Sequence, residues 1–148
     1  MDKWERQDIN NLDFKELCEN FYYYKRKMGY GPAAIEGYDA NVFICIFKDK
    51  EQLISNWKKI NYIIAFRVQK RIDKIIEKSN FYICLFVNEC IGSDNKSRIQ
   101  GNSFCAKKYV FEEKLMHCMY ILHQETWMKQ ISRSWKSIKK KTQIMYAV

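Results

Sequence analysis

The chain has 148 residues, of which 47% are hydrophobic and 16% aromatic, a composition that argues for one folded domain and against wholesale disorder. The formal net charge is +9, which favours a polyanion, a membrane surface or an acidic protein as partner, with a merely solvated basic surface as the alternative. No run of 18 apolar residues occurs and the first residues are polar, so we expect a cytoplasmic protein with no membrane contact.

The chain contains six cysteines and no CxxC pair. Cys45 and Cys84 stand inside apolar runs, where a free thiol packs as a small hydrophobic group. We therefore expect unpaired thiols in a reducing compartment. One proline and five glycines favour long regular elements over a loop-rich fold.

The first expected element is an N-terminal helix over residues 13–28, with the sequence DFKELCENFYYYKRKM. Asp13 can cap this helix, and Glu16 completes a capping box three residues later. The residues with helical spacing are Phe14, Leu17, Cys18 and Phe21. Residues 29–40 hold three of the five glycines and the only proline, which predicts an irregular connection.

An α/β core is expected over residues 41–111. Its first strand, residues 41–47, is a continuous apolar run of strand length. A long helix with an apolar stripe of period 3.6 follows over residues 50–78, and a second buried strand over residues 80–89. The third strand, residues 102–111, comes after a short polar link, which favours antiparallel pairing with the second strand.

The third strand carries Lys107 and Lys108 side by side. Neighbouring strand residues point to opposite faces, so the two charges cannot both face solvent if one face is core. We expect at least one of these lysines to reach the rim, to pair with an acid such as Glu89, or to face another subunit. Lysine is also a common guard of exposed strand edges, which predicts that this strand lies at an edge.

A C-terminal helical element is expected over residues 112–141, with Glu112 and Glu113 in its first turn. Its apolar stripe consists of Trp127, Ile131, Trp135 and Ile138. A basic stripe on another face consists of Lys129, Arg133, Lys136 and Lys140. Residues 129–141 hold six cations and no acid, which makes this helix the strongest functional feature of the sequence.

These elements predict a single domain, residues 1–148, of the α/β (α+β) class. It comprises a small mixed sheet of about three strands, a long crossover helix, and N-terminal and basic C-terminal helices. The candidate residues for binding a partner or DNA are Lys107, Lys108, Lys129, Arg133, Trp135, Lys136 and Lys140. The alternative for the basic helix is an amphipathic element that closes the core and leaves its lysines in water.

The patterns of catalytic and metal-binding residues are weak. The cysteines and histidines lack the local pairs that structural zinc requires, and His117 beside Cys118 cannot form a nucleophile–base pair. Glu112 and Lys114 match the E-x-K part of a PD-(D/E)xK nuclease, but this triplet is a very weak pattern in a lysine-rich chain, and glutamates at a helix N-terminus are the simpler reading. No phosphate-binding P-loop is present, so we expect no cofactor, no metal and no enzymatic activity.

The strand FYICLFVNE, the polar link after it and the stretch RIQGNSFCAKKYVF together carry a resemblance. They resemble the small middle component of bacterial three-component ABC ATPase systems, the Lamassu-type antiphage defence operons, over about residues 60–113. The matching positions are Glu89, Ile99, Cys105, the basic pair Lys107 and Lys108, and Val110. The family prefers arginine where Lys107 stands and an acid near Asn102.

This resemblance implies a non-catalytic adaptor subunit. Its expected partners are an SMC-like ABC ATPase that senses DNA and a nuclease effector, with DNA itself as a further candidate partner. Two alternatives stay open: a stand-alone basic nucleic-acid-binding protein, and a degenerate PD-(D/E)xK-type nuclease.

Overall fold

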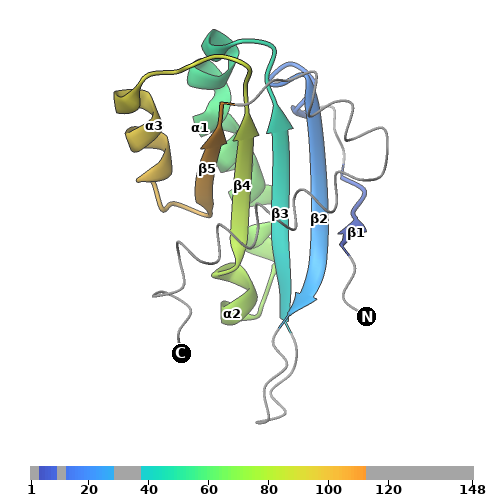
Figure 1. Ribbon diagram of the computed structural model, residues 1–148. Helices are drawn as coiled ribbons and strands as arrows, with labels where there is room; N and C mark the ends of the chain where they lie inside the picture. Colours follow the sequence, from blue (N-terminus) through green and yellow to red (C-terminus); the bar gives the residue numbers. More distant parts are fainter. Residues whose placement is uncertain (1–3, 10–12, 29–37, 113–148) are drawn as a thin grey trace. The chain divides into compact units, whose positions relative to one another are not determined.

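The computed structural model describes residues 4–9, 13–28 and 38–112 (Figure 1). The chain divides into two compact units, Met1–Lys114 and Leu115–Val148, and the fold below is that of the first unit. The predicted helix after Glu112 lies outside the described residues. So do the five candidate residues on it, Lys129, Arg133, Trp135, Lys136 and Lys140.

The described unit is built on a mixed sheet of five strands in sequential order. The strands are β1 (Glu5–Arg6), β2 (Asn20–Met28), β3 (Tyr38–Ile46), β4 (Phe81–Phe86) and β5 (Lys107–Phe111). β2 pairs antiparallel with β1 and β3, whereas β3, β4 and β5 are mutually parallel. The predicted α/β class with a mixed sheet is therefore confirmed, and the prediction of about three strands was too low.

The predicted antiparallel pairing of the last two strands is wrong. The polar link between them forms the helix α3 (Ser93–Gln100), which carries the chain back along the sheet so that β5 runs parallel to β4. The expected edge position is correct for the described sheet, in which β5 has β4 as its neighbour on one side only.

The predicted helix over residues 50–78 is broken. It consists of α1 (Lys50–Arg67), a 3-10 turn η2 (Gln69–Arg71) and α2 (Ile75–Lys78). The side-chain amide of Gln69 donates to the Lys78 carbonyl at 2.9 Å and to the Cys105 carbonyl at 2.6 Å. These tertiary bonds fold the chain at a point where isoleucine spacing alone suggested a continuous helix.

The predicted N-terminal helix over residues 13–28 is also wrong. Only one turn forms, in which the Leu17 and Cys18 amides donate to the Phe14 carbonyl. The aromatic residues that follow enter β2, since tyrosine and phenylalanine suit a strand better than a helix. Asp13, expected as a helix cap, instead forms an ion pair with Arg67 of α1.

The core lies between the sheet and α1, which Figure 1 shows behind the strands. Phe43 and Ile83 of the central strands join Leu53 and Ile60 of α1 in one buried cluster. Ile99 of α3 belongs to the same cluster, so α3 packs on the same face as α1. The alternate residues of β3 and β4 are buried as well, as expected for parallel strands in the middle of a sheet.

Sequential strand order has a consequence for function. Both crossovers run in the same direction and place their helices on one face. The described sheet therefore has no position at which the strand order reverses, the usual place for cofactor binding in open α/β sheets.

Asp49 caps the N-terminus of α1, and this role can be tested. The Asp49 carboxylate accepts a hydrogen bond from the Gln52 amide at 2.8 Å, and Gln52 in turn binds the Lys48 amide at 2.9 Å. We expect Asp49→Ala to lower the free energy of unfolding by about 1 kcal/mol in urea denaturation, the usual cost of losing an N-cap. Asp73→Ala, at an exposed residue between η2 and α2, is the matched control. Equal losses in both variants would contradict the assignment of the cap.

Candidate functional site

Lys108 is the most unusual side chain of the candidate site. It is only 2% exposed, on the face of β5 that meets the core. Its ammonium group donates to the carbonyls of Phe104 and Ala106, both at 2.8 Å. It also donates to the carbonyl and the side-chain oxygen of Asn102, at 3.1 and 2.8 Å. We call these four acceptors the oxygen cage.

The oxygen cage explains how a buried charge is tolerated. Burial lowers the pKa of Lys108 to about 8, which still leaves the ammonium mostly protonated at neutral pH. Four oxygens then supply the hydrogen bonds that a buried cation requires. Lys108 does not reach the rim or pair with an acid such as Glu89, so the expectation that at least one of the two lysines would do so or face another subunit now concerns Lys107.

The segment before β5 takes its shape from the cage. The Ala106 amide donates to the Phe104 carbonyl at 2.8 Å, closing a three-residue turn around Cys105. Cys105 has a φ of 69°, and a positive φ costs energy in a residue with a side chain. Gln69 binds the Cys105 carbonyl from the other side, so the turn is held at each residue.

This turn brings an exposed aromatic ring next to α1. Phe104 packs its ring 5.3 Å from that of Tyr62, which in turn lies 6.2 Å from the ring of Phe66. We call these three residues the aromatic patch. Our reading of the sequence missed the patch, although one signal was present: Tyr62 and Phe66 stand four residues apart, off the apolar stripe that faces the core.

Lys107 lies on the opposite face of β5 from Lys108, as alternation predicts. It pairs in register with Tyr82 and places its ammonium 5.9 Å from the centre of that ring. Lys107 is half-buried, so the strand does carry one positive charge on each face. Its role in binding a partner or DNA stays a prediction.

The Glu112 carboxylate has structural partners within the described unit. It accepts a hydrogen bond from the Ile91 amide at 2.8 Å and forms an ion pair with Lys96 at 3.3 Å. The bond from Ile91 is the main reason that the pKa of Glu112 is lowered. These contacts fasten the loop before α3 to the end of β5, a role that differs from that of a metal-binding nuclease carboxylate.

Cys84 and Cys105 are poor nucleophiles. Cys18, Cys45 and Cys84 are buried, as expected for packed thiols. Burial raises the pKa of Cys84 to about 12 and that of Cys105 to about 11, whereas a nucleophilic cysteine needs a thiolate. Across residues 4–9, 13–28 and 38–112, no three His, Cys, Asp or Glu side chains gather where they could hold a metal ion.

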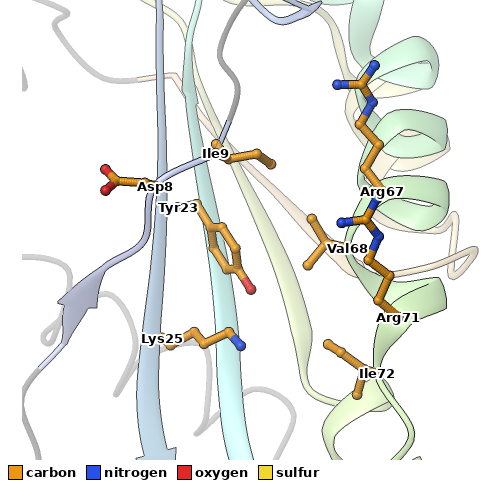
Figure 2. Close-up of a pocket in the computed structure, with 8 residues that line it drawn as sticks. All are labelled: Asp8, Ile9, Tyr23, Lys25, Arg67, Val68, Arg71 and Ile72. Carbon is orange, nitrogen blue, oxygen red and sulfur yellow. The ribbon is translucent and has the colours of Figure 1, made fainter.

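A groove of about 650 Å³ lies between β2 and the end of α1 (Figure 2). Its lining consists of Asp8, Ile9, Tyr23, Lys25, Arg67, Val68, Arg71 and Ile72. Figure 2 shows Tyr23 and Lys25 projecting from the strand towards the helical wall, with the Asp8 carboxylate turned away from it. The groove is therefore both cationic and apolar.

The groove offers binding surface and little acid–base chemistry. The Tyr23 hydroxyl donates to the Asn41 side-chain oxygen at 2.5 Å, and burial, helped by the nearby Glu77 and Asp39 carboxylates, raises the pKa of Tyr23. Arg67 is already paired with Asp13. Among the described lining residues, a general base would have to come from Asp8, whose carboxylate faces away from the opposite wall.

Taken by class, the fold is a mixed α/β sheet with both of its helical crossovers on one face, and the described site is a surface suited to binding. The family model described as ABC-three component (ABC-3C) system Middle Component 1 matches residues 41–117, just over half of the chain. The chain belongs to this family, so it is an accessory component of a multi-component system and has partner subunits. No curated protein and no solved structure gives a significant match.

The family match runs from residue 41, within β3, to beyond the end of β5, with α1, the oxygen cage and the aromatic patch between its limits. The groove residues of β2 and the basic residues 129–141 lie outside the matched segment. None of the described helices is long and apolar enough to cross a membrane.

The oxygen cage can be tested by removing its cation. Lys108→Met keeps an unbranched side chain, one atom shorter than lysine, but leaves four oxygens without their donor, and we expect a loss of about 3 kcal/mol in the free energy of unfolding. Hydrogen exchange should show faster exchange at residues 104–106 in the same variant. Lys107→Met removes the same charge from the neighbouring, half-buried position and should cost less than about 1 kcal/mol. Equal stability of the Lys108→Met variant and the wild type would contradict the account of the cage.

The Glu112 contacts predict a pH dependence. Because the pKa of Glu112 is lower in the folded state than its ordinary value of 4.5, its stabilising contribution is present above pH 4.5 and is lost as the pH falls through the lowered pKa. We expect Glu112→Gln to cost about 1 kcal/mol at pH 7 in urea denaturation, and this difference to shrink on acidification. Glu89→Gln, at an exposed carboxylate, is the control. A Glu112→Gln deficit that does not change with pH would contradict the electrostatic origin.

Proposed function

We propose that this middle component is a non-catalytic adaptor in antiphage defence of the Lamassu type. It bridges an SMC-like, DNA-sensing ABC ATPase and a nuclease effector in the cytoplasm. The basic residues Lys129, Arg133, Lys136 and Lys140, together with Trp135, bind a partner subunit or DNA.

The observation that carries this proposal is the family match over residues 41–117. A middle component works with other subunits, and the resemblance of the segment around Lys107 and Lys108 to Lamassu-type components supports the finer assignment. The described side chains add support of a different kind: Glu112 is held by Ile91 and Lys96, and burial raises the pKa of the Cys84 thiol. Binding surfaces account for these features better than a reaction centre does.

The proposal is tested by affinity purification of the tagged chain from its native host. We expect the ATPase and the effector to co-purify with the wild-type protein. Reversing the charge of Lys129, Arg133, Lys136 and Lys140 to glutamate should weaken that association at least tenfold, which corresponds to about 1.4 kcal/mol. The melting temperature should not change, because the proposed role of these residues is in binding.

The matched control reverses four exposed lysines of the described unit: Lys15, Lys27, Lys48 and Lys50. This control should retain both partners. If the wild-type chain purifies alone and binds DNA with a steep salt dependence, the stand-alone nucleic-acid-binding alternative replaces the adaptor. Metal-dependent DNA cleavage that is lost on Glu112→Ala would instead support the nuclease alternative.

A further inference from the structure

Three aromatic side chains stay in solvent although the unit has an ample core. Tyr62 is 52% exposed and Phe66 61% exposed on the outer side of α1, and Phe104 is 48% exposed in the turn before β5. Their rings contact one another, at centre distances of 6.2 and 5.3 Å, so they form one continuous surface. Contiguous exposed apolar surface of this kind marks interaction sites in soluble proteins, whereas scattered exposed residues do not.

The helix segment that carries Tyr62 and Phe66 is basic in sequence. Between Glu51 and Asp73 the chain contains five basic residues and no acidic residue. Lys58 and Lys59 precede Tyr62 by one helical turn, so they flank it on α1, and both are exposed. The patch is therefore apolar at its centre and cationic along the helix that carries it.

The patch is also rigidly supported. The oxygen cage fixes the position of Phe104. Its carbonyl accepts a hydrogen bond from the buried Lys108 ammonium at 2.8 Å, and its amide donates to the Asn102 side chain at 3.1 Å. Tyr62 and Phe66 stand on a regular helix. A partner that binds here does not have to order the loop first, which lowers the entropic cost of association.

We propose that the aromatic patch binds an acidic segment of a partner subunit, one that presents apolar side chains between its carboxylates. This inference rests on the proposed function, since it names the surface by which the adaptor holds one of its partners. Aromatic residues dominate the energetics of interface centres, and a cationic surround selects partners of opposite charge.

Ring geometry favours a protein segment over single-stranded nucleic acid. Successive bases stack on accessible ring faces that follow the strand. The Tyr62 and Phe66 rings are nearly parallel, at 9°, but the Phe104 ring is inclined at 49° to that of Tyr62, so the three rings do not form a common stacking platform. Such an angled surface suits branched or aromatic side chains, which can pack against rings of different inclination.

The first experiment measures retention of partner subunits by the full chain, purified as a complex from its native host. Tyr62→Ser combined with Phe66→Ser should reduce retention of one partner at least tenfold, with no loss of melting temperature because both side chains are exposed. Ile75→Ser combined with Ile76→Ser removes exposed apolar surface from α2 and should retain the partner. Lys58→Glu combined with Lys59→Glu should weaken binding, whereas Lys48→Glu combined with Lys50→Glu should not.

A photocrosslinker identifies the segment that is bound. Tyr62→p-benzoylphenylalanine should form an adduct, after irradiation of the complex, with a partner peptide of net negative charge. An adduct with nucleic acid or with a basic peptide overturns the inference, as does full retention of both partners by the Tyr62/Phe66 variant. Wild-type chain that retains no partner at all overturns the proposed function as well, so the two failures are distinguishable.

Discussion

The buried ammonium of Lys108 is the interaction on which the described surface depends. Its four oxygen acceptors come from Asn102, Phe104 and Ala106, all within six residues of the lysine. These acceptors converge only if the chain turns tightly at Cys105, with a positive φ that an isolated peptide avoids. The cation therefore stabilises a strained turn, and the turn decides where Phe104 lies.

The fold could be predicted where local pattern and tertiary context agree. The apolar runs that became β3 and β4 are buried on both faces, so they need no alternation and read as strands directly. The segment that became β2 misled the prediction because Phe14, Leu17 and Cys18 do form one helical turn. Pairing with β3 then makes the rest of that segment a strand. This pairing is a long-range effect, and the spacing of apolar residues within the segment does not reveal it.

The sequence predicts that the candidate site contains a buried lysine, but it does not predict which atoms bind the ammonium group. Two adjacent lysines on a half-buried strand require that one of them be buried, and Lys108 is. An acid such as Glu89 was one of the expected partners, because side-chain acceptors are visible in a sequence. Backbone carbonyls are present at every position, so a sequence does not show which of them converge on a cation. The exposure of Phe104 follows from that convergence and was hidden for the same reason.

The same cage links the core to the surface. An apolar side chain at position 108 would satisfy the core but would give the carbonyls of Phe104 and Ala106 no reason to face inward. The turn could then relax at Cys105, and Phe104 would be free to leave Tyr62. A buried charge is a costly way to fill a core position, because desolvation opposes it. The buried charge does, however, fix the local conformation. That conformation holds the Phe104 ring in solvent beside the rings of Tyr62 and Phe66. A subunit that must present a preformed surface to a partner has a use for this arrangement that a self-contained domain lacks.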